Sequence, residues 1–133
     1  MGGGNNEDLT DHARDDQVAA VMLKESKAEA RAWLGQAGHM MARGENDEAL
    51  SLVEAFYKAG AVAVYVSDIG GDPKGEAYAQ LMVVTLPKGA EERKAVIGVA
   101  AGHNFGGERK PPKVMKEFGF FDSGQKYVIV NFL

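Results

Sequence analysis

The stretch NDEALSLVEAFYKAGAVAVYV (residues 46–66) decides the fold. Its first part is typical of an amphipathic helix, because Asn46 can cap the first turn, acidic residues follow it, and apolar residues recur at helical spacing until Gly60. Residues 61–66 then form a nearly continuous apolar run, which is typical of a strand in the centre of a sheet. A helix that leads directly into a buried strand indicates a protein built of a helical layer and a sheet.

Two further elements follow this unit. The polar, glycine-rich segment 70–75 is expected to be a loop, and residues 76–86 are expected to form a second long strand. Because the loop is short, the two strands should be antiparallel. Residues 90–101 have the pattern of a second helix, with acidic residues in its first turn and Gly102 at its end.

The last part of the chain is less regular. Residues 102–123 are interrupted by glycine and proline pairs, and within them 113–118 could form a short helix. Residues 126–133 are rich in β-branched side chains and are expected to form the terminal strand.

The N-terminal part divides near residue 17. Residues 1–16 are rich in glycine and acids and are expected to be disordered, because they bury too little apolar surface to offset the entropy of ordering. A single domain is therefore expected over 17–133, beginning with a helical pattern over 17–35. Residues 40–42 could either finish a helix or form a short strand.

The order of these elements predicts an α+β fold. If residues 40–42 form a strand, the order is the βαββαβ of the ferredoxin-like fold: an antiparallel sheet with two helices on one face, preceded here by an N-terminal helix. The alternative is a three-stranded sheet with the N-terminal helix over part of an edge. The uncovered face of the sheet should meet the N-terminal helix, a second copy of the chain or a partner protein.

Composition excludes several classes of protein. The 133 residues suit one domain, and the absence of cysteine excludes disulfides, thiol nucleophiles and cysteine–zinc sites. No apolar run is long enough for a membrane helix. The net charge of −4 equals the acidic excess within residues 1–17, so the remaining chain is neutral and nucleic-acid binding is not expected.

Short motifs are spread over residues 46–133. They are LVE (52–54), Tyr57, GA (60–61), VYVSDI (64–69), Leu86-Pro87, Arg93 and DSGQKY (122–127). On these motifs the chain resembles an uncharacterised family of small bacterial ferredoxin-like α+β proteins. The resemblance implies the ferredoxin-like fold and brings no catalytic residues, because none is established for such proteins.

His103 and Asn104 are candidate ligand-binding residues in the glycine-flanked segment 102–107. Glycines would let backbone amides approach a phosphate, and an imidazole can act as a base or a ligand near neutral pH. However, phosphate loops lead from a strand into a helix, whereas this segment follows a helix. The structural interpretation is a helix C-cap and a flexible connection.

Asp122 and Gln125 lie in a predicted turn, where they could line a pocket or set the register of the last strand. Asp68, the remaining candidate for ligand binding, ends the first long strand and could bind a hard cation together with Asp72. The neighbouring loop lacks the further regularly spaced oxygens of a calcium site, and the histidines lack metal-binding spacing. We therefore expect neither a metal site nor a cofactor.

The sequence contains no recognisable enzyme motif. Its serines are not in a nucleophile elbow, and no lysine has a visible activating environment. We expect a non-enzymatic binding or interaction domain that binds an unidentified protein or associates with itself through the sheet face. The alternative is a small enzyme or small-ligand-binding protein that uses the loops 68–75, 102–107 and 122–125.

The first residues bear on localisation. Met1–Asn6, followed by acids, resembles the flexible segment after the lipid-bearing cysteine of a bacterial lipoprotein. In that interpretation a signal peptide and a cysteine precede this sequence, and only the lipid anchor ties the domain to a membrane of the cell envelope. The alternative is a plain flexible N-terminus on a cytoplasmic protein.

Overall fold

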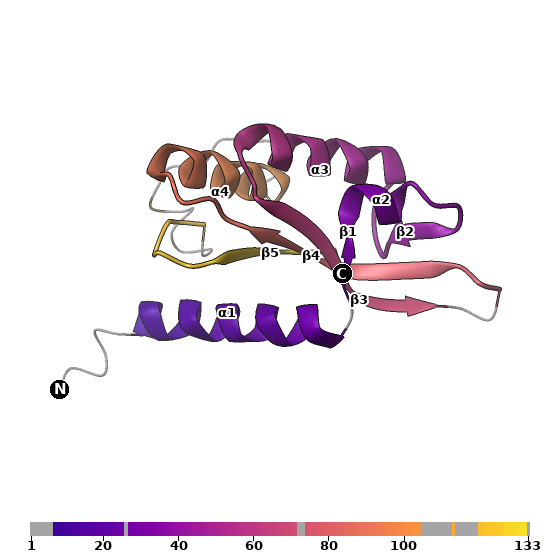
Figure 1. Ribbon diagram of the computed structural model, residues 1–133, viewed down its shortest axis with the longest axis horizontal. Helices are drawn as coiled ribbons and strands as arrows, with labels where there is room; N and C mark the ends of the chain where they lie inside the picture. The colour runs from indigo at the N-terminus through magenta and orange to yellow at the C-terminus, as the bar shows by residue number, and fades with distance from the viewer. Residues whose placement is uncertain (1–6, 26, 72–73, 105–112, 114–119, 133) are drawn as a thin grey trace.

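The computed structural model describes residues 7–25, 27–71, 74–104, 113 and 120–132 (Figure 1). The expected α+β class is confirmed. In chain order the elements are α1 (Glu7–Glu25), β1 (Ala28–Glu29), α2 (Ala30–Leu34), β2 (His39–Met41), α3 (Asn46–Ala59), β3 (Ala63–Gly71), β4 (Ala77–Thr85), α4 (Ala90–Asn104) and β5 (Tyr127–Asn131).

Helix α3 forms where its apolar spacing predicts it. Val53 and Phe56 are completely buried, and the helix ends at Gly60, whose φ of 115° is favourable for a residue without a Cβ atom. The expected N-cap is wrong by one residue. Glu45 occupies the cap position, and Asn46 instead donates from Nδ2 to the carbonyl of His39 at 3.0 Å, which ties α3 to β2.

Strand β4 is the centre of the sheet. One edge pairs antiparallel with β3 along nearly its whole length, as expected, and β1 pairs antiparallel with the far edge of β3. The other edge of β4 has two partners in succession. Residues 77–79 pair in parallel with β2, and residues 81–85 pair antiparallel with β5.

The ambiguous segment thus contains a strand, β2, which lies one residue earlier than the expected 40–42 and ends at Met41. The parallel β2–β4 pair and the antiparallel β3–β4 pair are those expected of a split βαβ unit. The full ferredoxin-like strand order is not confirmed, because β5 pairs with β4 and not with the outer edge of β2. The reason is length: β2 pairs with only three residues of β4, so the rest of that edge is open to β5.

Helices cover both faces of the sheet (Figure 1). Helices α3 and α4 lie on one face, over a core of Val53, Phe56, Val64, Val66, Met82, Val84, Val96, Val128 and Val130, among others. Helix α1 lies on the opposite face, where the Ser67 hydroxyl donates to the carbonyl of Met22 at 3.1 Å. Of the three occupants considered for this face, the N-terminal helix is the one that the structure contains.

The N-terminal elements differ from the expectation. Helix α1 begins at Glu7, within the segment expected to be disordered. The helix predicted over 17–35 is divided into the second half of α1, strand β1 and the short helix α2. The division occurs where β1 pairs with β3, a contact between residues far apart in the sequence that local helix propensity cannot indicate.

Helix α4 also departs from the prediction, since it continues past Gly102 to Asn104. His103 and Asn104 are therefore in its last turn and not in a loop. The rest of the segment 102–107 lies outside the described residues, as do Asp72 and nearly all of the short helix suggested at 113–118.

Candidate functional site

The candidate residues from the sequence lie in three places. Asp122 binds Arg93 near the start of α4, whereas His103 lies near its end. Ten residues separate Arg93 from His103, which is about 15 Å along a helix. Asp68 is exposed on β3. Within the described part of the chain, the three segments thus contribute to separate places and do not form one cavity.

Asp122 is held in a tight turn by Arg93. The Arg93 guanidinium donates to both carboxylate oxygens of Asp122, at 2.8 and 2.9 Å, and to the carbonyls of Pro87 and Gln125. Asp122 Oδ1 also accepts from the N–H of Gly124 at 3.0 Å, as the turn signature predicts. The hydrogen bonds from Arg93 are the main cause that lowers the pKa of Asp122.

Gln125 is buried within the same turn. Its Nε2 donates to the carbonyl of Phe121 at 2.9 Å, and its Oε1 accepts from the N–H of Ser123 at 2.8 Å. The side-chain amide of Gln125 therefore connects two backbone groups of the same turn. These contacts favour the structural interpretation of Asp122 and Gln125, which hold the chain in place before β5.

Asp68 has a backbone distortion. Its φ is 55°, the one positive value found for a non-glycine residue in the described chain. It lies opposite the point where β4 changes partner, between the pairs Ser67↔Leu81 and Ile69↔Ala79. No group of three or more potential metal ligands occurs among the described residues, and Asp72 lies outside them, so a cation shared by Asp68 and Asp72 is not tested.

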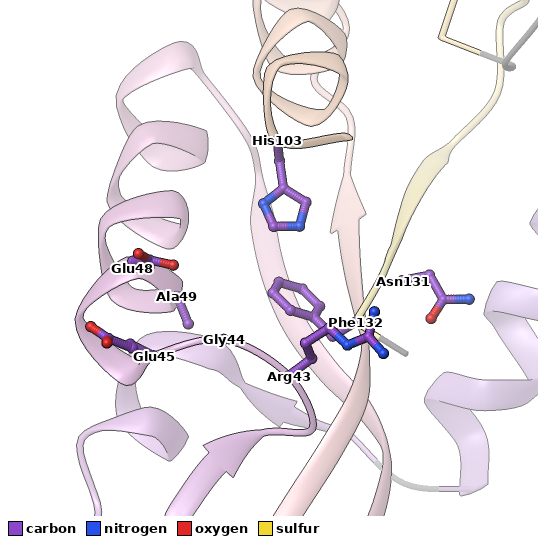
Figure 2. A pocket seen from close by; sticks show the side chains of 8 residues that line it. All are labelled: Arg43, Gly44, Glu45, Glu48, Ala49, His103, Asn131 and Phe132. Atoms are coloured by element: carbon purple, nitrogen blue, oxygen red, sulfur yellow. The ribbon is translucent and has the colours of Figure 1, made fainter. Parts of the chain in front are cut away.

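His103 lines a groove that the sequence did not predict (Figure 2). The groove has a volume of about 290 Å³ and is formed by the turn before α3, the first turns of α3, the end of α4 and the end of β5. Its lining residues are Arg43, Gly44, Glu45, Glu48, Ala49, His103, Asn131 and Phe132.

The floor of this groove is apolar and its rim is polar. Ala49 and Phe132 are buried, and the His103 ring lies over the Phe132 ring with 5.0 Å between the centroids. Figure 2 shows Glu48 on the α3 side, while Arg43 extends toward the end of β5. Glu45 and Asn131 point away from the space between the helices. The groove thus offers groups of opposite charge on either side of an aromatic surface.

Backbone hydrogen bonds hold the parts of the groove together. The N–H of Ala42 donates to the carbonyl of Ala79, and the N–H of Phe132 donates to the carbonyl of Gln80, both at 2.8 Å. Consecutive residues of β4 therefore position the chain on both sides of the groove. Gly44, with a φ of 91°, forms the turn that places Arg43 at the rim.

The chemistry of the groove suits binding. The Arg43 guanidinium and the Glu48 carboxylate can form charge-assisted hydrogen bonds, and the His103 imidazole lies beside the Phe132 ring. The two acids, Glu45 and Glu48, lie at the start of α3, where the helix dipole favours negative charge, and His103 lies in the last turn of α4.

A second group of charged side chains lies on α2 and α3. Arg31 donates to both oxygens of Glu54 and stacks over the ring of Tyr57, whose hydroxyl donates to Glu29 at 2.5 Å. Burial alone would raise the pKa of Glu29, but hydrogen bonds from Tyr57 and from the N–H of Ala32 outweigh it and lower the pKa. Burial and the hydrogen bond to Glu29 raise the pKa of Tyr57. These side chains bind one another and tie β1, α2 and α3 together.

Of the groove residues, sequence reasoning found only His103. Arg43, Glu48, Asn131 and Phe132 belong to no motif and are distant from one another along the chain. Their only local signal is Gly44, which indicates a turn beside Arg43.

Comparison with protein families, with curated proteins and with solved structures finds no match for this chain. Among the described residues, no helix has the length and apolar character needed to cross a membrane.

Proposed function

We propose that this protein is a non-enzymatic domain that binds a small polar ligand in the groove between α3, α4 and the end of β5. One observation carries the proposal: three separate segments, namely residues 43–49, the end of α4 and the end of β5, converge there on a groove with an apolar floor and a polar rim. Binding sites for small molecules typically combine a mostly apolar surface with a few convergent polar groups. The volume of about 290 Å³ is at the lower end of such sites and suits a small ligand.

The charges indicate the class of ligand. Arg43 can pair with a carboxylate or another planar anion, and Glu48 can pair with an ammonium group. The rings of His103 and Phe132 between them offer an apolar surface. A small zwitterion, such as a free amino acid, would satisfy both charged sides at once.

The alternative function, an enzyme built from the loops 68–75, 102–107 and 122–125, gains no comparable support. Such an enzyme needs the loops to share one cavity, and the described residues of the three lie apart. Asp122 accepts from Arg93 and from the N–H of Gly124, and Gln125 uses its side-chain amide within the turn.

The topology is proposed to be a variant of the ferredoxin-like fold. The β2–β4 and β3–β4 pairs support this view, and β5 differs in pairing with β4. The resemblance to the small bacterial family stays a prediction.

Titration of the isotope-labelled protein with free amino acids, followed by NMR, tests the ligand. We expect at least one zwitterion to shift the backbone amides of Gly44, Ala49 and Phe132. Arg43→Gln and Glu48→Gln should each weaken binding about tenfold, because each loses a charge-assisted hydrogen bond. Lys94→Gln is the matched control, since Lys94 is exposed on α4 and does not line the groove.

Acetate and methylammonium, each carrying one charge of the zwitterion, complete the test. They should bind more weakly than any amino acid that binds. If no zwitterion moves these amides at millimolar concentration, or if acetate alone binds as tightly, the proposed function is wrong.

A further inference from the structure

The contact between α1 and the start of β5 has the form of a bound anion. The two carboxylate oxygens of Asp16 accept from two consecutive backbone N–H groups, those of Lys126 at 3.0 Å and Tyr127 at 3.3 Å. Consecutive backbone amides directed at one carboxylate are a recurring way in which proteins bind anions. The anion here belongs to the protein's own N-terminal helix.

The surroundings of these amides are basic. Beside them lies a groove of about 480 Å³, whose charged lining residues are Lys88, Arg93 and Lys126. No acidic residue among those that the structure describes lines this groove, and Asp122 pairs with Arg93 beside it. The pKa of Arg93 is raised mainly by Asp122 and in smaller part by Asp16, so the Asp16 charge is felt by the guanidinium.

The charge of the N-terminal segment is complementary to this basic groove. Residues 1–17 carry five acids and one arginine, which is the whole net negative charge of the chain. An acidic helix thus lies with one of its carboxylates at a basic groove, and opposite charges favour this docking.

The structure describes the side chains of α1 over residues 16–25. There Ala19 is completely buried and Met22 and Leu23 are half-buried, whereas Val18 and Val21 are 40% and 52% exposed. Because part of this apolar surface stays in water, polar contacts matter for the docking of this part of the helix. The described polar contacts include the Asp16 carboxylate and the bond from Ser67 to Met22.

We propose that the amides of Lys126 and Tyr127 and the adjoining basic groove form a recognition site for an acidic peptide segment of a partner protein, and that α1 occupies this site as a tethered competitor. Release of Asp16 exposes these two N–H groups beside Lys88 and Lys126, and near Arg93, which keeps its ion pair with Asp122. A partner segment that presents a carboxylate in the same geometry takes the place of Asp16. The proposal is independent of the ligand groove, because the two sites share no lining residue.

The two amides provide a direct measurement of this exchange. Hydrogen exchange of Lys126 and Tyr127 is followed by NMR in the full chain, in Asp16→Lys and in the control Glu25→Gln, which neutralises an exposed acid on the same helix. Asp16→Lys should accelerate exchange of both amides about tenfold or more, because it removes the charge-assisted acceptor and repels the basic groove. Glu25→Gln should leave the exchange rates unchanged.

A synthetic peptide with the sequence of residues 7–25 is then added to the Asp16→Lys chain. We expect it to slow exchange of both amides again, and the same peptide with Asp16→Asn to lack this effect. Lys88→Glu in the Asp16→Lys chain should weaken peptide binding several-fold, because it replaces a cation of the groove with an anion. Acetate at the same concentration is the control for a simple carboxylate.

Three results would overturn the proposal. The first is unchanged protection of the two amides in Asp16→Lys. The second is failure of the peptide to restore protection, or equal action of its Asp16→Asn form. The third is an equal effect of acetate, which would show a simple anion site without peptide recognition.

Discussion

Arg93 shows how single side chains connect distant parts of this protein. Its guanidinium donates to Asp122 and to the carbonyls of Pro87 and Gln125, so it joins α4 to the chain after β4 and to the turn before β5. The Arg93 side chain is 13% exposed and that of Asp122 is 36% exposed. Solvent therefore screens part of this ion pair, and its worth lies between that of a surface pair and that of a buried one.

At the residue scale, Asp122→Asn should lower the free energy of unfolding by about 1 kcal/mol at neutral pH, because the ion pair with Arg93 is lost. Asparagine can still accept from the N–H of Gly124, so the turn itself should persist. Urea denaturation of both proteins measures the difference. A variant as stable as the wild type would show that Arg93 holds the turn without its ion pair.

The same pair of proteins should reveal a dependence on pH. The folded-state pKa of Asp122 lies below its usual value of 3.8, so the wild-type advantage is fully present above that value. It should disappear as the pH falls through the lowered pKa and Asp122 takes up a proton. Repeating the urea denaturation between neutral and strongly acidic pH tests this. A difference between the proteins that persists at the acidic end would contradict it.

At the scale of the element, two glycines beside Glu92 differ in what a side chain would cost. Gly60 ends α3 with a φ of 115°, and a Cβ there would lie 3.1 Å from the Glu92 Cβ. At Gly89, φ is ordinary and a Cβ would meet only the carboxylate end of the Glu92 side chain, which can rotate away. Glu92 thus faces Gly60 with its Cβ atom, which cannot move away, and Gly89 with its carboxylate, which can.

Gly60→Ala should therefore lower the free energy of unfolding by about 1–2 kcal/mol, since it combines a left-handed backbone with a close contact. Gly89→Ala should change it by less than about 0.5 kcal/mol. Thermal or urea unfolding of the two variants measures the contrast. Equal effects would mean that the backbone conformation at Gly60 does not matter for the end of α3.

At the scale of the whole molecule, the two faces of the sheet are covered by different helices. Helices α3 and α4 bury a large apolar core on one face, and α1 lies on the other, where Val18 and Val21 stay exposed (Figure 1). We therefore expect the core under α3 and α4 to supply most of the stability. Exchange of α1 on the other face is the outcome proposed above.

Phe56→Ala should accordingly lower the free energy of unfolding by about 3–5 kcal/mol, because Phe56 is completely buried between α3 and the sheet. Val62→Ala is the control: it lies in the same apolar stretch but is 65% exposed, so its effect should stay within about 0.5 kcal/mol. Denaturant unfolding of the two variants measures both changes in the free energy of unfolding. A small effect of Phe56→Ala would place the stabilising core elsewhere.

The sequence by itself determined α3, the β3–β4 pair, the second helix and the turn at Asp122. Each of these depends on residues close together in the chain: apolar spacing, a terminal glycine, a short polar loop and a carboxylate that reaches an N–H two residues away. It also found His103, although in a loop and not in the helix where it lies.

Only the tertiary structure decided the position of β5, the division of the N-terminal helix and both grooves. Strand β5 pairs with β4 because β2 leaves that edge open, and β1 interrupts a helical pattern because the edge of β3 accepts it. Arg43 and His103 line one groove, and Asp16 reaches the N–H of Lys126, only after the sheet has formed. Such contacts between distant residues depend on shape and on open strand edges, which local sequence patterns do not contain.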